Sequence, residues 1–373
     1  MMANLQLTST LRPSGEVEIA LAESAMPEPG EGEIVVEMIA APLHPTDMGL
    51  LFAAADPGTA ERVTRDGRTI TVLQAAPGPA MAQRRRWDKA LPVGTEGAGR
   101  VVSAGPGDEA QALLGRFVAI WGGGMYTRYR KLRAADALAL PDGTSAAEGA
   151  AAFVNPLTAL GMIETMRDEG FTALVHTAAA STLGQMLSRL CEQEKIGLVN
   201  IVRQPEQVEL LRSIGAEHVC STGSPSFEED LLAALRATGA TLAFDAIGGG
   251  RLASQILAAM EQVCAAGGDF RMYGSDISKK VYIYGGLDRG PVELFRNYGS
   301  VWDVGGWLLF PFLKRIGPER AERLKQRVAG ELKSTFVMTY SQRISLQDVC
   351  DPEMLRAAAR KATGEKYLLN LQR

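Results

Sequence analysis

The stretch VHTAAASTLG, residues 175–184, decides the fold of this chain of 373 residues. Residues 172–177 are mostly apolar and typical of a buried strand, and residues 183–194 carry apolar side chains at helical spacing. The residues between them are small and leave room for a tight turn. The stretch therefore predicts a strand that turns directly into a helix.

The same alternation continues toward the carboxyl end. Further strands are predicted over 197–202, 218–221 and 241–247, with helices over 205–214, 227–238 and 252–264. Short strands separated by helices of about ten residues or more form βαβ units, which build parallel sheets covered on both faces. Because the crossovers between such strands are right-handed, we expect a doubly wound parallel sheet of an α/β fold.

Toward the amino end the sequence changes to short strands that are broken by glycine and proline. Strands are predicted over 17–21, 33–40 and 116–121, and the stretch 94–107 is rich in glycine. This pattern indicates a compact, partly barrel-like β unit.

The last part of the chain is expected to return to this β unit. Helices are predicted over 307–316 and 318–332, followed by short strands over 334–340 and 367–371. The predicted organisation is therefore a β domain, residues 1–143 and 317–373, into which an α/β domain, residues 144–316, is inserted.

The composition limits the classes of partner. Hydrophobic residues make up 46% and charged residues 22%, and the formal net charge is −4. A mildly acidic chain has no general field that attracts nucleic acid or an anionic membrane. The sequence has neither a long apolar segment nor a signal-peptide pattern at its start. It predicts a soluble, cytoplasmic protein with no nucleic-acid or membrane partner.

Histidine and cysteine are scarce. The chain has three histidines and four cysteines, and no two cysteines stand close enough for a CxxC pair. A catalytic zinc ion needs three protein ligands, of which at least two are spaced locally. We therefore expect no metal site and no disulfide framework, and we interpret the cysteines as small buried apolar residues.

The turn between the predicted strand 172–177 and the predicted helix 183–194 has the position of the dinucleotide motif G-x-G-x-x-G. Its three motif positions hold Ala179, Ser181 and Gly184. Alanine and serine still allow a close approach of the backbone to a phosphate, and the third glycine allows the helix to pack on the strand. We therefore predict that the pyrophosphate of a dinucleotide binds here. The contacts are assigned to Ala179, Ala180, Ser181, Thr182, Leu183 and Gly184.

Arg203 indicates which dinucleotide is bound. NAD-binding units carry an acidic residue after the second strand, where it binds the ribose 2′-hydroxyl. Here the predicted strand 197–202 is followed by Arg203, and the first acid is Glu206. An arginine pairs with a 2′-phosphate through charge-assisted hydrogen bonds, which favours NADPH over NADH. The alternative is a surface arginine that caps a loop.

Four segments, in order along the chain, resemble the medium-chain dehydrogenase/reductase superfamily, on its zinc-free quinone oxidoreductase and enoyl-thioester reductase side. They are GTEGAGRVV (94–102), NPLTA (155–159), LRSIGAEHV (211–219) and FDAIGG (244–249). The resemblance runs from about residue 42 to the carboxyl end, except for an insertion over 51–90. It implies a Rossmann domain inserted into a GroES-like β-barrel catalytic domain.

The resemblance also implies further contacts with the cofactor. Thr158 would contact the nicotinamide ribose, and the turn 246–248 would line the crevice at the strand ends. The segments 284–287 and 306–308 would hold the nicotinamide amide. For Trp307 a place in the core is an equal alternative, because an aromatic residue at the start of a helix is often buried. The residues assigned by resemblance are Thr158, Ala246, Ile247, Gly248, Tyr284, Gly285, Gly286, Trp307 and Leu308.

The segment LHPTDM, residues 43–48, resembles the Asn-Pro-Ser-Asp motif of zinc-free members, with His44 in place of the asparagine. If a dedicated proton donor exists, the candidates are His44, Asp47 and Tyr126, which the resemblance places on loops that face the catalytic cleft. A structural hydrogen-bonding role is the alternative, above all for Asp47.

The predicted function is NADPH-dependent, zinc-independent hydride transfer to a quinone or an α,β-unsaturated carbonyl, which is a small-molecule electron acceptor. The first alternative is an enoyl-thioester reductase, in which the arginines 84–86 would bind phosphates; the tyrosine that such enzymes carry is missing from 52–55. The second is a protein that binds NADPH without turnover.

A homodimer is also expected, because these reductases commonly join through the last strands of their nucleotide sheets. The predicted edge strand is 278–284. Specificity for the acceptor is expected to lie in the 51–90 insertion and in the loops around Tyr126.

Overall fold

We describe the protein from a computed structural model, which covers residues 3–266, 271–360 and 366–372. The chain forms two compact units. Unit 1 comprises Met1–Val154 and Lys325–Arg373, and unit 2 comprises Asn155–Leu324. Among the described residues, no helix is both long and apolar enough to cross a membrane.

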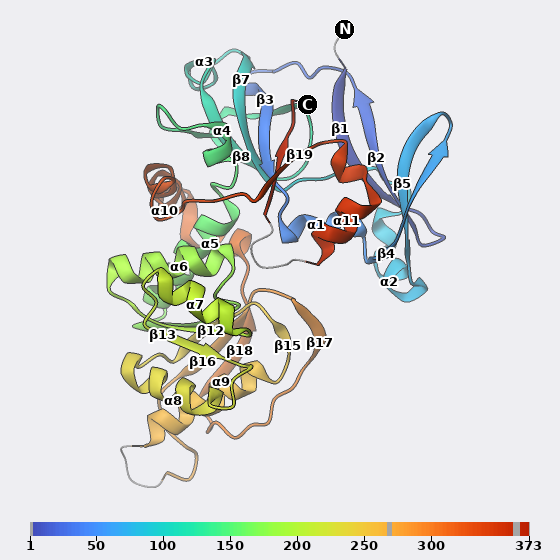
Figure 1. Ribbon diagram of the computed structural model, residues 1–373. Helices are drawn as coiled ribbons and strands as arrows, with labels where there is room; N and C mark the ends of the chain where they lie inside the picture. The colour runs from blue at the N-terminus through green and yellow to red at the C-terminus, as the bar shows by residue number, and fades with distance from the viewer. Residues whose placement is uncertain (1–2, 267–270, 361–365, 373) are drawn as a thin grey trace. The chain divides into compact units, whose positions relative to one another are not determined.

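Unit 1 is built from two sheets (Figure 1). The first has the order β4-β5-β2-β1-β6. Its strands are β1 (Asn4–Leu11), β2 (Glu16–Ser24), β4 (Ala55–Arg65), β5 (Arg68–Ala75) and β6 (Leu91–Pro92). The alternating side chains of these strands place Leu7, Leu11, Val17 and Ile19 in one buried core, which is why the pattern near residues 17–21 forms a strand.

The second sheet has the order β10-β8-β7-β3-β20-β19, and β9 also pairs with β3. Its strands are β3 (Glu33–Pro42), β7 (Glu96–Ala104), β8 (Phe117–Trp121), β9 (Tyr129–Arg133), β10 (Leu138–Ala139), β19 (Gln342–Ser345) and β20 (Tyr367–Asn370). The helices of unit 1 are α1 (Pro45–Phe52), α2 (Pro77–Ala82), α3 (Asp108–Ala112), α4 (Ala146–Gly149) and α11 (Pro352–Ala359).

The carboxyl-terminal segment completes the second sheet. β20 pairs antiparallel with β3, and Leu369 lies opposite Ala41. The prediction of a strand over 334–340 was wrong. The strand in this part of the chain lies further on, as β19 (Gln342–Ser345). Residues just after α10 (Leu309–Glu331) instead form a turn, in which the amides of Ser334 and Phe336 both donate to the carbonyl of Glu331.

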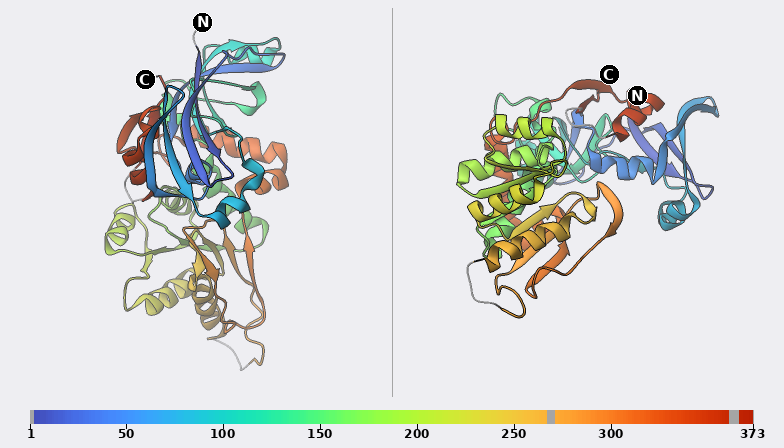
Figure 2. Two further views of the ribbon diagram at one scale, coloured as in Figure 1. Left: turned by 90° about the vertical axis from the view of Figure 1, so that its right-hand side faces the viewer. Right: turned by 60° about the horizontal axis from the view of Figure 1, so that its bottom comes forward.

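The insertion over 51–90 belongs to the first sheet. It contributes β4 and β5, a hairpin that forms the outer edge of the sheet and is drawn in light blue in Figures 1 and 2. Its arginine triplet is divided between two environments, with Arg84 and Arg85 exposed and Arg86 buried. The Arg86 guanidinium donates to Ser9 Oγ (3.0 Å) and to the carbonyl of Leu50 (2.9 Å), so Arg86 holds the insertion against the sheet.

Unit 2 contains a six-stranded parallel sheet of order β13-β12-β11-β14-β16-β18. The strands are β11 (Ala173–Thr177), β12 (Gly197–Val202), β13 (His218–Ser221), β14 (Leu242–Asp245), β16 (Lys279–Ile283) and β18 (Trp302–Gly306). The helices are α5 (Val154–Asp168), α6 (Thr182–Glu194), α7 (Pro205–Ser213), α8 (Phe227–Thr238), α9 (Leu252–Ala265) and the part of α10 up to Leu324, after which α10 belongs to unit 1. Two short strands, β15 (Gly248–Gly250) and β17 (Asp288–Val292), pair beside this sheet and curve together in the right-hand view of Figure 2.

The strand order overturns one prediction. The segment 278–284 was expected at the edge, but β16 lies between β14 and β18 and pairs with both. The edge strand is β18, whose Trp302–Gly306 segment carries three glycine or aspartate residues and gives a weak strand signal. The predicted domain boundaries, before residue 144 and before residue 317, fall near α4 and at Gly317, where α10 is interrupted.

Candidate functional site

The turn after β11 presents backbone amides at the start of a helix. Ser181 caps α6, and its Oγ accepts from the amide of Gly184 (3.2 Å). Thr182 and Leu183 occupy the first two helical positions, so their amides have no acceptor within the helix. The positive end of the helix dipole lies at the same place. The turn is therefore suited to bind a phosphate group.

Gly184 is required by the close packing of this turn. A Cβ atom added to it would lie 2.1 Å from the carbonyl oxygen of Ala179. Ala179 and Ala180 are buried, and the Ala179 amide donates to the carbonyl of Ile201 in β12 (3.1 Å). The glycine of the sequence motif thus fixes the distance between helix and strand, as its position predicted.

Arg203 follows β12 directly and is exposed. Its backbone is fixed, because Gln207 Oε1 accepts from the Arg203 amide (3.0 Å) and Ser221 Oγ donates to the Arg203 carbonyl (3.1 Å). Its guanidinium group has no hydrogen-bond or ion-pair partner within residues 3–266, 271–360 and 366–372. A fixed backbone with an available cation fits the recognition of an added phosphate better than the capping of a loop.

A buried aspartate organises the end of β14. Asp245 accepts from Thr177 Oγ1 (2.6 Å), from the Ile247 amide (3.0 Å) and from the Gly248 amide (3.0 Å). These bonds hold the predicted contact residues 246–248 in a defined turn beside the end of β11. The segment FDAIGG pointed to this region, but the role of its aspartate as the centre of a hydrogen-bond network was missed.

The segment after β16 lies against the same turn. A Cβ atom on Gly285 would lie 2.4 Å from the carbonyl oxygen of Ala246, so only glycine allows this approach. The structure therefore brings together two stretches that are about forty residues apart in the sequence, 246–248 and 284–286. Both lie at the carboxyl ends of parallel strands, where ligands of such sheets bind.

The Tyr284 side chain is held by His176 of β11. Its hydroxyl group lies 2.8 Å from His176 Nε2, and the two rings are stacked with centroids 5.8 Å apart. Burial lowers the pKa of His176 to about 3, so the imidazole is neutral and can accept the phenolic proton. Burial, assisted by the charge of Asp245, raises the pKa of Tyr284, so the phenol keeps its proton.

Trp307 occupies the core of unit 2. Its Nε1 donates to Thr165 Oγ1 (3.0 Å), and its ring contacts Phe244 edge-on and Phe312 at a tilt. Of the two alternatives for this residue, the structure favours the core. The neighbouring Leu308 is 58% exposed, and Thr158 in α5 is buried.

A second group of polar residues lies in unit 1, and we name it the Asp47 cluster: His44, Asp47, Thr95, Glu96 and Tyr126. Asp47 Oδ2 accepts from the Tyr126 hydroxyl (2.6 Å) and from the His44 amide (2.9 Å). Its Oδ1 accepts from Thr95 Oγ1 (2.5 Å). The structure thus brings together the three residues that were predicted as proton-donor candidates.

These three candidates differ in their access to solvent. Tyr126 is 0% exposed and Asp47 is 2% exposed. Burial, together with the charge of Asp47, raises the pKa of Tyr126 well above its ordinary value. His44 is partly exposed; it caps α1, and its Nδ1 accepts from the Thr46 amide (3.1 Å). Of the three candidates, only His44 has access to the surface.

Glu96, like Thr95, is a member of the cluster that the sequence did not single out. Its Oε2 accepts from the amides of Phe153 (2.9 Å) and Val154 (3.0 Å). Among the described residues, its buried Oε1 has no hydrogen-bond partner. Burial raises the pKa of Glu96 to about 8, and the charge of Asp47 acts in the same direction. The sequence signal that could have identified Glu96 is its place after Gly94 and Thr95 in the segment 94–102, which contributed only to the family resemblance.

The structure also shows the burial of the cysteines and the arrangement of possible metal ligands. Cys191 and Cys220 are buried, Cys264 and Cys350 are partly buried, and all four are free thiols. Burial raises the pKa of Cys191, Cys220 and Cys350 to about 12. In the part of the chain that the structure describes, no three His, Cys, Asp or Glu side chains are arranged to hold a metal ion.

No protein-family model matches the sequence. Solved structures do match its full length. A protein of Mesorhizobium loti assigned as an NADPH:quinone reductase is 23% identical, with a TM-score of 0.72, and the match covers 99% of both chains. A mycobacterial protein determined in complex with NADPH is 18% identical, with a TM-score of 0.65, and the match covers 99% of this chain and 100% of that one.

A mutant form of an enoyl thioester reductase from Candida tropicalis is 17% identical, with a TM-score of 0.66, over 99% of this chain and 100% of that one. These matches confirm the predicted fold class, in which a Rossmann domain with a parallel sheet is inserted into a GroES-like β domain. The chain therefore shares the fold of these quinone and enoyl thioester reductase structures.

Proposed function

We propose that this protein is an NADPH-dependent oxidoreductase that transfers hydride to a quinone or an α,β-unsaturated carbonyl without a metal ion. The observation that carries the proposal is the exposed, unpaired guanidinium of Arg203 at the end of β12, close in the fold to a helix start with available amides. The structural likeness to NADPH:quinone reductases supports the same assignment.

The residues of unit 2 fit NADPH. The amides of Thr182 and Leu183 can donate to the pyrophosphate, and Arg203 can pair with the 2′-phosphate. Gly184 and Gly285 keep the backbone close, where a Cβ atom would collide. When bound, NADPH supplies the hydride, and the protein contributes binding and orientation.

The strand ends of unit 2 are proposed to orient the nicotinamide. The backbone of 246–248, fixed by Asp245, and the backbone of 284–286, anchored by the Tyr284–His176 pair, would hold its amide group. Thr158 would contact the ribose, and the exposed Leu308 remains a candidate contact. Because these groups are positioned before binding, little conformational entropy is lost when the ring is oriented.

In unit 1 we propose His44 as the group that donates a proton to the reduced acceptor. Its imidazole is partly exposed, whereas the side chains of the other two candidates are buried. Asp47 and Tyr126 are positioning residues, because both are buried and Asp47 holds the backbone amide of His44 (2.9 Å). A bound metal ion has no part in this scheme.

Two alternatives are tested with this proposal. An enoyl-thioester reductase is favoured by the structural likeness to such enzymes. Against it, residues 52–55 contain no tyrosine, and Arg86 is buried and engaged with Ser9 and Leu50. A protein that binds NADPH without turnover is the second alternative.

The test follows NADPH oxidation by the loss of its absorbance, with a simple quinone, an enone and an enoyl thioester as acceptors. We expect turnover with the quinone or the enone, and a substantially lower turnover with His44→Ala when the acceptor is an enone. Turnover with the thioester alone would establish the first alternative. Quenching of tryptophan fluorescence by NADPH without turnover of any acceptor would establish the second.

We also propose that Asn155–Leu324 acts as the nucleotide-binding domain, that the protein is a cytoplasmic homodimer, and that β18 forms the subunit contact. β18 is an edge strand and pairs on one side with β16. An exposed strand edge is usually covered in the native assembly. Sedimentation equilibrium tests the dimer, and Val304→Pro in β18 is expected to give a monomer.

A further inference from the structure

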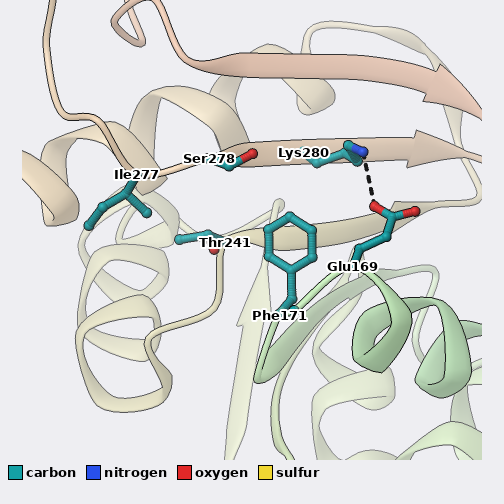
Figure 3. A pocket seen from close by; sticks show the side chains of 7 residues that line it. Glu169, Phe171, Thr241, Ile277, Ser278 and Lys280 are labelled. Atoms are coloured by element: carbon teal, nitrogen blue, oxygen red, sulfur yellow. Dashed lines mark hydrogen bonds and ion pairs between the residues drawn. The ribbon is translucent and has the colours of Figure 1, made fainter.

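Unit 2 has a pocket of about 450 Å³ that is separate from the predicted nucleotide contacts. It lies where β14 and β16 begin, whereas the turn after β11 lies at the opposite, carboxyl end of the sheet. Its volume is within the range of about 300–1,000 Å³ that small-molecule sites occupy. The side chains that line it are Glu169, Phe171, Thr241, Ile277, Ser278 and Lys280 (Figure 3).

An ion pair forms one wall of this pocket. Lys280 Nζ lies 2.9 Å from Glu169 Oε2, and both side chains are 21% exposed. The Tyr282 hydroxyl donates to Glu169 Oε1 (2.5 Å) and keeps the carboxylate in place. Of its three N–H groups, the Lys280 ammonium directs one to Glu169 and one to the Tyr282 hydroxyl (3.5 Å), and a carboxylate has about four acceptor positions, so both partners retain capacity to bind a ligand.

The rest of the lining is mixed. Ser278 and Lys280 lie on the same side of their strand segment and face Phe171 and Glu169, as Figure 3 shows. In the described part of the chain, the hydroxyl groups of Thr241 and Ser278 have no hydrogen-bond partner. Phe171 is partly buried and Ile277 is 45% exposed, and the two offer apolar surface.

The charges around the pocket select the ligand. Asp303 Oδ2 lies 4.0 Å from Lys280 Nζ and adds a second negative charge to that of Glu169. A lone carboxylate can pair only with Lys280 and is repelled by the two acids, and a lone ammonium is attracted by the two acids but cannot pair with Lys280. A molecule that carries both charges, separated by one carbon atom, can pair with both members of the ion pair at once.

We propose that this pocket binds the zwitterion of an α-amino acid with an apolar side chain. The α-carboxylate contacts Lys280 and the Ser278 hydroxyl, and the α-ammonium contacts Glu169. The apolar side chain packs on Phe171 and Ile277, which gives burial energy in addition to the paired charges. The proposal is independent of the nucleotide site.

The test titrates L-phenylalanine into the full chain by isothermal calorimetry. Two analogues each remove one charge: L-phenylalaninamide lacks the carboxylate, and 3-phenylpropanoate lacks the ammonium. We expect saturable binding of L-phenylalanine at one site, and binding at least about tenfold weaker for each analogue, which corresponds to about 1.4 kcal/mol. Equal binding of either analogue, or no binding of L-phenylalanine, would overturn the proposal.

A pair of variants locates the site. Ser278→Tyr fills the pocket from an exposed position without removing the ion pair, and Ser213→Tyr places the same side chain at an exposed position on α7. Ser278→Tyr is expected to weaken binding of L-phenylalanine at least about tenfold, and Ser213→Tyr to leave it unchanged. Lys280→Gln gives a second measurement and is expected to weaken binding similarly. Wild-type affinity in both Ser278→Tyr and Lys280→Gln would show that the amino acid binds elsewhere.

Discussion

The Asp47 cluster of unit 1 and the turn after β11 in unit 2 use polar groups in opposite ways. In the cluster, the Asp47 carboxylate is 2% exposed and accepts three hydrogen bonds from the protein itself. At the turn, Ser181 and Arg203 are exposed, and the Arg203 guanidinium has no partner within the described residues. The buried Asp47 is therefore closed to a ligand, whereas Arg203 has capacity left for one.

The difference has an energetic basis. A buried carboxylate is tolerated only when its acceptors are filled, because an uncompensated charge in the interior costs several kcal/mol. An exposed guanidinium is hydrated and needs no internal partner, so it can exchange water for a phosphate. Buried polar residues that hydrogen-bond to one another therefore indicate a structural role. Exposed polar residues whose side chains have no partner indicate a role in ligand binding. The following predictions test this comparison, beginning with the largest effect.

Asp47→Ala should cause the largest loss of stability. It removes the acceptor of the His44 amide and of Thr95 Oγ1, and it leaves the Tyr126 hydroxyl with the Pro42 carbonyl (2.8 Å) as its remaining acceptor. We expect the free energy of unfolding to fall by about 3–5 kcal/mol. Asp142→Ala, at an exposed turn of the same unit, is the control and should change it by less than about 0.5 kcal/mol. Equal effects in urea denaturation would contradict the scaffold role.

Glu96 should make stability depend on pH within the same closed region. Its pKa is raised from 4.5 to about 8, so the folded protein binds one more proton than the unfolded chain between these values. The contribution of Glu96 to the free energy of unfolding is therefore fully present below pH 4.5 and is lost as pH rises toward 8. Between pH 6 and pH 8.5 the loss due to this group is on the order of 3 kcal/mol.

Glu96→Gln should abolish this contribution, because the amide cannot ionise. The measurement compares the free energy of unfolding of wild type and variant at both pH values, and the exposed Glu109→Gln serves as the control. His176, whose pKa is lowered to about 3, acts in the opposite direction, since its stabilisation is lost as pH falls below 6.5. An unchanged pH dependence in Glu96→Gln would show that Glu96 does not titrate in this range.

Arg203→Glu tests the open region. We expect the affinity for NADPH to fall at least about tenfold, while the affinity for NADH stays within a factor of about two, because only NADPH carries the 2′-phosphate. Arg212→Glu, on the exposed face of α7, makes the same charge change and should affect neither cofactor. Cofactor affinity is measured by tryptophan fluorescence. A parallel loss for both cofactors would refute the assignment of Arg203.

Ser181→Ala should give the smallest effect. It removes the hydrogen bond from the Gly184 amide to Ser181 Oγ at the start of α6, which is worth about 1 kcal/mol. We expect a correspondingly small decrease in the midpoint of thermal unfolding. Ser181→Asp keeps a capping oxygen and should retain stability, but its negative charge should weaken NADPH binding. A large loss of stability in Ser181→Ala would mean that the turn belongs to the scaffold as well.

Much of the fold followed from local patterns. The alternation of strands and helices from β11 to α9 is a property of nearby residues, since hydrophobic periodicity is set within one element. The sequence also predicted the contact glycine Gly184 and the available cation Arg203. It failed where the outcome depends on distant partners. The edge position assigned to 278–284 was wrong because strand order is decided by which strands pair across the sheet.

The candidate site shows the same division. The sequence selected His44, Asp47 and Tyr126 one by one. Their proximity in space depends on the hydrogen bond between Asp47 and Tyr126, which are 79 positions apart. Glu96 was missed because its importance comes from burial and from the amides of Phe153 and Val154. In the triplet 84–86, one arginine is buried and two are exposed, and nothing in three identical residues distinguishes them.

The sequence by itself determined the βαβ alternation, the strand–turn–helix at 175–184 and the absence of an acid directly after β12. These features depend on the size, polarity and spacing of neighbouring residues, which the sequence states directly. Only the tertiary structure decided which strand forms the edge, that Asp47 and Tyr126 are closed to solvent, and that Arg203 is left unpaired. Burial and pairing depend on residues far apart in the chain, and those contacts fix the free energy of each charge.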